Sequence, residues 1–138
     1  MKVMPMAKVS IVVISHSKQL AEGIVELVSQ TKQKDVIVAA AGGTEEEEIG
    51  TSVDIITKTI NEVYNEAGVL LLFDLGSAFM NAELAAEMLP DMEGSVQIAD
   101  APIVEGTYIA AVEAGLGYSL EEVKNAAEKA KTWKKMDG

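Results

Sequence analysis

The only histidine of this 138-residue chain follows a short apolar run, so it is the first residue to consider for chemistry. His16 stands between Ser15 and Ser17, and the largely apolar residues 9–14 precede these three residues. A neutral imidazole attacks phosphorus well when one nitrogen faces the donor and the other gives its proton to an acceptor. Asp74 follows another apolar run and could accept that proton, select the tautomer and stabilise the charge that develops on the ring. His16 and Asp74 are therefore the candidate reactive pair.

Each member of this pair also has a purely structural interpretation. A lone histidine after a strand can simply cap a turn, and its position alone does not decide between the two roles. An aspartate such as Asp74 is a common N-cap of a helix. The functional interpretation gains weight because both residues follow predicted strands, and ligands of open parallel sheets bind outside the carboxyl ends of the strands.

Glycines and hydroxyls that follow the predicted strands are suited to hold a phosphate group. Glycine permits close approach of the backbone, and a helix N-terminus offers free N–H groups to phosphoryl oxygens. The pair Gly42-Gly43 is a weak signal alone, since it lacks both the lysine of a Walker loop and the spacing of a dinucleotide fingerprint. The predicted phosphate-binding residues are Ser15, Gly42, Gly43, Thr44, Gly76 and Ser77.

The composition excludes several kinds of chemistry. Cysteine is absent, which rules out disulfides, thiol nucleophiles and thiolate metal sites, and we expect neither a metal nor a cofactor. All eleven basic residues are lysines, so a phosphate must be held by backbone N–H groups, hydroxyls or lysine. A catalytic arginine is excluded.

The charge and the hydropathy pattern narrow the partners. A net charge of −11 argues against nucleic acid and against anionic membrane surfaces, which both attract positive charge. The longest apolar runs are far shorter than the ~20 residues of a membrane-spanning helix. Residues 1–6 lack the apolar core and cleavage site of a secretory signal. We therefore expect a cytoplasmic protein.

Apolar runs alternate with helical patterns, which is typical of βα units around a parallel sheet. The runs are rich in branched residues, as strands covered on both faces are. We predict the α/β class, with one open, mostly parallel sheet of about four to five strands and helices on both faces. The length fits one domain over residues 1–138, of which about 1–8 form a ragged lead. The predicted strands are residues 9–14, 36–41, 69–73 and 96–99.

Apolar stripes at helical spacing predict the intervening helices. Two capping boxes, Thr44 with Glu47 and Ser119 with Glu122, predict the starts of the second and fifth helices. Residues 45–48 are all glutamate and would then complement the positive end of the helix dipole. We prefer this interpretation of the four carboxylates over a metal site. Pro102 suits the start of the fourth helix. The side chains expected to face the core are Leu20, Ile24, Leu27 and Val28; Ile49, Val53, Ile56, Ile60 and Val63; Phe79 or Met80, Leu84, Met88 and Leu89; and Val123, Ala126, Ala127, Ala130 and Trp133.

Four blocks of sequence, residues 14–17, 40–52, 72–83 and 100–106, together resemble one family. They are similar to the phosphotransfer subunit of bacterial dihydroxyacetone kinase, which is itself similar to the enzyme IIA domain of the mannose-type sugar phosphotransferase system. The resemblance runs from about Val9 to near Trp133. The third and fourth blocks favour the dihydroxyacetone branch.

The resemblance implies a function for the reactive pair. His16 matches the histidine that the phosphocarrier protein HPr phosphorylates, and Asp74 matches the carboxylate that orients it. The phosphoryl group then passes to ADP bound on the nucleotide-binding subunit of the kinase. The resemblance also implies a homodimer. Longer relatives append domains similar to HPr, whereas this chain stops at Gly138, so we expect HPr to be a separate protein.

Three other functions remain open at the level of sequence. A mannose-type enzyme IIA domain that serves a sugar permease would use the same chemistry with another acceptor. A non-catalytic module that binds a small anion would use the same glycines and hydroxyls. A hydrolase could pair a serine with His16 and Asp74, but the chain has no G-x-S-x-G nucleophile elbow.

Overall fold

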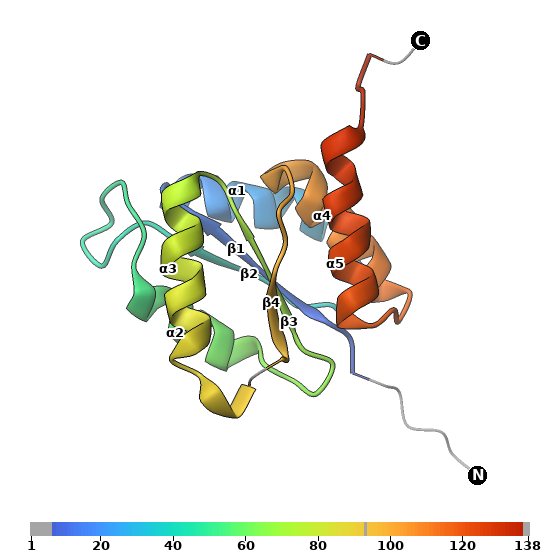
Figure 1. The fold of residues 1–138 in the computed structure, drawn as a ribbon. Coiled ribbons are helices and arrows are strands. Elements are labelled where there is room, and N and C mark those ends of the chain that lie inside the picture. The colour runs from blue at the N-terminus through green and yellow to red at the C-terminus, as the bar shows by residue number, and fades with distance from the viewer. Residues whose placement is uncertain (1–6, 93, 137–138) are drawn as a thin grey trace.

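A computed structural model describes residues 7–92 and 94–136 and shows an open, four-stranded parallel sheet (Figure 1). All three strand pairs are parallel, and the strand order is β2-β1-β3-β4. The predicted α/β class and sheet type are confirmed. Most of the predicted N-terminal lead lies outside the described residues. The strands are β1 (Ser10–Ser15), β2 (Val38–Gly42), β3 (Val69–Phe73) and β4 (Val96–Ile98).

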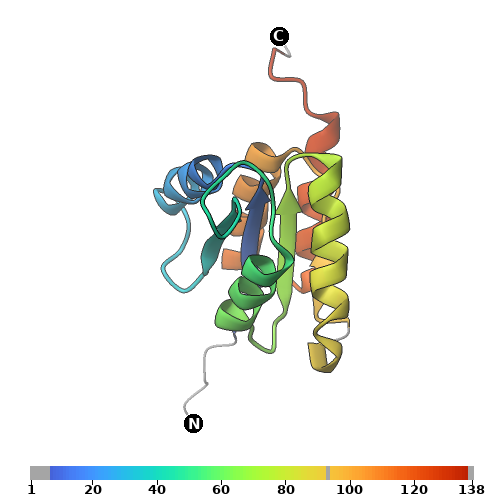
Figure 2. The same cartoon turned by 90° about the vertical axis from the view of Figure 1, so that its left-hand side faces the viewer.

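Helices cover both faces of this sheet, and Figure 2 shows them on its two sides. One face carries α1 (Lys18–Ser29), α4 (Ile103–Gly115) and α5 (Leu120–Glu128). The other face carries α2 (Val53–Val63) and α3 (Gly76–Glu87). Short 3₁₀ turns follow α3 at Pro90–Met92 and α5 at Lys129–Thr132. None of the helices in the described residues is long and apolar enough to cross a membrane.

The two central strands, β1 and β3, are covered on both faces, and Phe73 at the end of β3 is their one half-buried residue. Along β1, Ile11 and Val13 pack under α1, α4 and α5, whereas Val12 and Ile14 pack under α2 and α3. All four side chains are fully buried. At about 25 cal/mol per Å² of apolar surface, such burial is the main stabilising term of a fold of this kind. The end of β1 is consequently a rigid support for whatever follows it.

The predicted start of α2 was wrong. The helix begins at Val53, and Ser52 is its N-cap, with Oγ accepting from the amide of Ile55 at 3.2 Å. Thr44 instead closes a loop, in which its Oγ1 accepts from the amide of Glu48 at 3.1 Å. Gly50, at φ +142°, separates this loop from the helix. The hydroxyl at position 44 thus makes a local loop bond of the kind that competes with helix formation.

The glutamates at positions 45–48 therefore lie in an exposed loop, and the predicted complement to the dipole of α2 was wrong as well. Ile49, predicted as a core residue, is 78% exposed in the same loop. Within the described ranges, no group of three or more His, Asp or Glu side chains is arranged to hold a metal ion.

Several large apolar side chains predicted to be buried point outwards instead. On α3 the sheet is contacted by Ala78, Ala82 and Ala85, which are fully buried and let the helix lie close to the strands. Met80 on the opposite side of that helix is 70% exposed. The other exposed residues of the predicted core are Leu20, Leu27, Phe79, Leu84, Met88 and Trp133.

The ends of the last two long helices agree with the sequence signals. Pro102 is the N-cap residue of α4, and Gly117, at φ +85°, follows its end. The capping box of α5 is complete, because Ser119 Oγ accepts from the amide of Glu122 while the carboxylate of Glu122 accepts from the amide of Ser119.

Replacing Thr57 on α2 with valine is expected to stabilise the fold. Its Oγ1 is buried, and in the part of the chain that the structure describes it has no hydrogen-bond partner. A buried unpaired hydroxyl costs about 1–3 kcal/mol, so Thr57→Val should raise the free energy of unfolding in urea by about 1 kcal/mol. Thr59→Val is the matched control, since that hydroxyl donates to the carbonyl of Ile55 at 2.8 Å. A loss of stability in Thr57→Val would contradict this prediction.

Candidate functional site

The candidate pair comes together because β1 and β3 are neighbours in the sheet. His16 follows the last residue of β1, and Asp74 follows the last residue of β3. Chain order reverses at this point, since β1 continues to β2 on one side and β3 lies on the other. Open α/β sheets bind ligands at such a switch point, outside the carboxyl ends of the strands.

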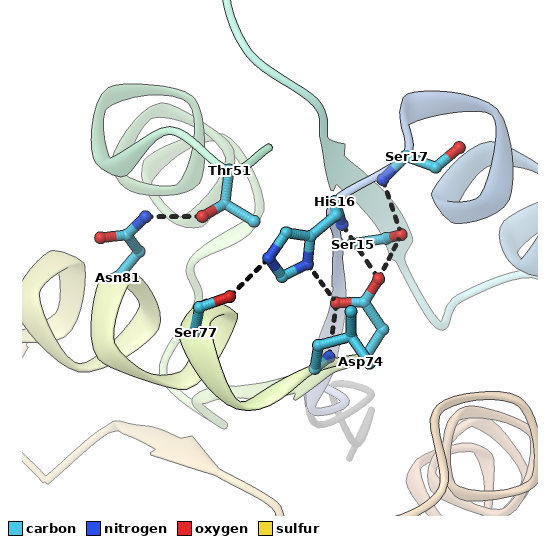
Figure 3. A network of polar contacts seen from close by, with 8 residues as sticks. Ser15, His16, Ser17, Thr51, Asp74, Ser77 and Asn81 are labelled. Atoms are coloured by element: carbon cyan, nitrogen blue, oxygen red, sulfur yellow. Dashed lines mark hydrogen bonds and ion pairs between the residues drawn. The ribbon is translucent and has the colours of Figure 1, made fainter. Parts of the chain in front are cut away.

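One carboxylate holds both the ring and the backbone of the histidine (Figure 3). His16 Nδ1 lies 2.9 Å from Asp74 Oδ1, and the amide of His16 donates to Asp74 Oδ2 at 3.0 Å. The side chains are only 20% and 13% exposed, respectively. The two bonds fix both the direction of the ring and its distance from β3.

Two further donors keep this carboxylate ionised. Ser15 Oγ donates to Asp74 Oδ2 at 2.8 Å, and the amide of Leu75 donates to Oδ1 at 2.7 Å. Burial acts to raise the pKa of Asp74, but the hydrogen bonds from His16, Ser15 and Leu75 together outweigh it and hold the pKa below its ordinary value. Asp74 is therefore an acceptor throughout the neutral pH range.

The remaining ring nitrogen carries the lone pair. Because the ionised Asp74 accepts at Nδ1, the ring proton resides there and His16 Nε2 is free to accept. Ser77 Oγ, in the first turn of α3, lies 2.6 Å from Nε2 and donates to it. In the neutral imidazole, Nε2 is thus the ring atom with an available lone pair, and the Ser77 hydroxyl lies directly in front of it.

The predicted glycine loop after β2 has internal hydrogen bonds. Gly42 pairs with Ser15 in the sheet, and a Cβ there would lie 2.8 Å from the carbonyl oxygen of Ser17. Gly43, at φ +74°, donates its amide to the carbonyl of Ser15 at 3.1 Å. The amide of Thr44 donates to the carbonyl of Glu48 at 3.1 Å. These glycines let the loop pack against the start of α1.

The predicted phosphate-binding residues therefore fall into two groups. Ser15 and Ser77 contact the reactive pair directly, and Gly76 is the first residue of α3, where amides have no acceptor within the helix. Gly42, Gly43 and Thr44 make the loop bonds described above.

The sequence pattern missed two polar residues beside the ring. Thr51 Oγ1 accepts from Asn81 Nδ2 at 2.5 Å, and Figure 3 shows both beside the Nε2 side of the imidazole. The only signal for Asn81 is that it lies four residues after Ser77, on the same face of α3. No pattern in the sequence indicates its partner.

Comparison with known proteins identifies one family over most of the chain. Residues 10–124 match the EIIA-man family model, described as the PTS system fructose IIA component. The phosphotransferase subunit DhaM of the PTS-dependent dihydroxyacetone kinase from Lactococcus lactis is 40% identical over 120 residues, covering 86% of this chain and 93% of the relative. The phosphoryl donor subunit DhaM from Providencia stuartii is 36% identical over 126 residues, which cover 88% of this chain and 26% of that protein.

A solved structure confirms the fold. A crystal structure of a protein described as of unknown function superposes with a TM-score of 0.82 at 34% identity, covering 92% of this chain and 99% of the other. The chain thus spans 99% of this solved chain but only 26% of the length of the Providencia relative. Since the family model covers most of the chain and the Lactococcus relative matches nearly end to end, this chain is a DhaM-like member of the EIIA-man family.

Proposed function

We propose that this chain is a phosphoryl carrier that receives a phosphoryl group from HPr on His16 Nε2 and passes it to ADP on the nucleotide-binding subunit of dihydroxyacetone kinase. The observation that carries the proposal is the orientation of the imidazole ring. Asp74 holds Nδ1, which leaves Nε2 with its lone pair. The names of the relatives, phosphoryl donor or phosphotransferase subunits of a dihydroxyacetone kinase, support the acceptor.

The transfer needs no proton movement at the histidine. The lone pair of His16 Nε2 forms the bond to phosphorus, while the bond from phosphorus to the donor atom breaks and its electron pair returns to the donor. The ring keeps its proton on Nδ1 and becomes positively charged, and Asp74 stabilises that charge. In the second step an oxygen of the ADP β-phosphate attacks, and the nitrogen–phosphorus pair returns to Nε2.

Positioning and charge stabilisation supply most of the catalysis of such a transfer. Ser77 Oγ occupies the line of attack at Nε2, so in the proposal it turns away and donates to a phosphoryl oxygen. The first amides of α3, at Gly76 and Ser77, are further donors. Ser15 is fully buried and donates to Asp74, which makes it a positioning residue.

No guanidinium group binds the phosphoryl oxygens, because the chain has no arginine. Neutral donors hold a dianion less tightly than a bidentate arginine does, which suits a group that must be released again. The proposal also includes a homodimer, which rests on the family resemblance, and a location in the cytoplasm.

The acceptor is tested with phosphorylated protein. After removal of HPr, the labelled chain is mixed with the kinase subunit loaded with ADP, and we expect the label to appear in ATP. The control is the same mixture without ADP, in which the label should stay on His16. Retention of the label with ADP present, combined with transfer to a mannose-type sugar permease, would replace the kinase by the permease as acceptor.

A further inference from the structure

Thr51 is fixed beside the reactive ring by two hydrogen bonds from different parts of the fold. The amide of its neighbour Gly50 donates to the carbonyl of His16 at 2.8 Å, which ties this segment to the end of β1. Asn81 Nδ2 donates to Thr51 Oγ1 at 2.5 Å, which ties the side chain to α3. The hydroxyl therefore lies between the strand that carries the nucleophile and the helix that carries Ser77, as Figure 3 shows.

The bond from Asn81 determines what the threonine hydroxyl can do. Its oxygen already accepts the amide proton, so its own O–H must point to another acceptor. Among the described residues, no acceptor for this proton is found. Ser77 and Asn81 are one turn apart on the same face of α3, so the two hydroxyls lie on the same side of the ring. Two O–H donors thus flank the space next to Nε2.

The site also needs a second donor for reasons of charge. A phosphoryl group on Nε2 brings three oxygens into a space where, among the described residues, the ring has polar contacts with Asp74 and Ser77 alone. The lysine closest to His16 in sequence, Lys18, forms an ion pair with Glu47. Besides the first amides of α3, hydroxyl donors are therefore the groups available to bind the phosphoryl oxygens.

We propose that Thr51, oriented by Asn81, donates a hydrogen bond to the phosphoryl group on His16 and is the partner of Ser77 in a two-hydroxyl cradle. This inference rests on the proposed phosphohistidine and adds two residues to it. Thr51 touches the reacting group, whereas Asn81 acts through Thr51 and is a positioning residue. The bonds made and broken at Nε2 are unchanged.

The test compares Thr51→Val with Thr51→Ser, using both HPr and phosphoramidate, a small chemical phosphoryl donor. Loss of one preorganised donor to a transition-state oxygen costs about 10²–10³-fold in other enzymes, so we expect Thr51→Val to slow labelling of His16 by about 10- to 100-fold with either donor. Thr51→Ser should stay within about threefold of the wild type, because it keeps the hydroxyl. The KM for phosphorylated HPr should not change.

Asn81→Ala should produce a smaller loss, about 3- to 10-fold, with unchanged KM, because Thr51 keeps its hydroxyl and loses only the group that orients it. Thr59→Val on α2 is the matched control and should label at the wild-type rate.

Each other outcome overturns the inference in a recognisable way. If Thr51→Val is labelled at the wild-type rate, Thr51 does not contact the phosphoryl group. If Thr51→Ser is labelled as slowly as Thr51→Val, the effect comes from packing and not from the hydroxyl. If labelling slows with HPr but not with phosphoramidate, the effect comes from docking of HPr. A wild-type protein that takes up no label at all rejects the phosphohistidine itself, so failure of the proposed function is distinguished from failure of this inference.

Discussion

Replacing His16 with alanine is expected to abolish phosphorylation of this protein altogether. With phosphoenolpyruvate labelled in its phosphoryl group, enzyme I and HPr, the wild type should acquire label that is lost in acid and retained in base. His16 is the only histidine of the chain, so no second imidazole can take over. The expected loss is complete rather than partial, because in the proposed mechanism the bond to phosphorus forms at its Nε2.

The alanine variant should still fold, which keeps the experiment informative. Asp74 retains the donors Ser15 Oγ, the backbone amide at position 16 and the amide of Leu75 after the ring is removed. His16→Gln is a second variant that keeps a polar side chain at the same place. Labelling of either variant at the wild-type level would rule out His16 as the phosphorylated residue.

Much of the fold follows from short-range patterns. Each predicted strand appears, because runs of branched apolar residues become the covered strands of a parallel sheet. The order of the strands could not be predicted from such patterns. It depends on which face of the sheet each crossover helix packs against, and no local pattern indicates that choice. The order nevertheless decides the site, because it makes β1 and β3 neighbours.

The errors in the helices have two physical causes. Apolar stripes indicate which side of a helix is buried only when the largest side chains face the core. On α3 the buried positions are alanines, and larger residues such as Met80 and Leu84 face outwards. At α2 two hydroxyls competed as caps, and the choice of Ser52 over Thr44 depended on the path of the loop around Gly50.

The residues of the candidate site that could be predicted are those that come just after a strand. His16 and Asp74 each follow a strand directly, so their meeting required only that the two strands be neighbours. Ser77 comes shortly after the same strand as Asp74, in the first turn of α3. Thr51 lies in a loop whose course is set by Gly50 and by a contact to Asn81, a residue 30 positions away in sequence, so its place could not be predicted.

Replacing Asp74 with asparagine is expected to slow phosphorylation by about 10²–10⁴-fold, in line with the loss of an orienting carboxylate in other enzymes. An asparagine amide can donate to Nδ1, which would force the ring proton onto Nε2 and remove the nucleophilic lone pair. The positive charge on the phosphorylated ring would also lose its counterion. The rate of labelling by phosphorylated HPr measures both effects, and an unchanged rate would reduce Asp74 to a helix-capping role.

Asp35→Asn is the matched control, because Asp35 pairs with Lys8 near the start of β2, at the opposite end of the sheet. Its labelling rate should equal that of the wild type. Circular dichroism should show both variants folded at neutral pH, since an asparagine oxygen in the place of Oδ2 still accepts from Ser15 Oγ and from the amide of His16. A slow Asp35→Asn protein would indicate that a general change of charge, and not the loss of the carboxylate at position 74, slows transfer.

Stability as a function of pH gives a second and independent measure of the same carboxylate. The pKa of Asp74 in the folded protein is below its ordinary value. Its carboxylate therefore adds stability that is complete above the unfolded-state pKa of about 4 and is lost as the pH falls through the lower folded-state pKa. The free energy of unfolding of the wild type should exceed that of Asp74→Asn at pH 6, and the difference should narrow below about pH 4. A difference that stays constant down to pH 2 would mean that ionised Asp74 is not what holds His16 Nδ1.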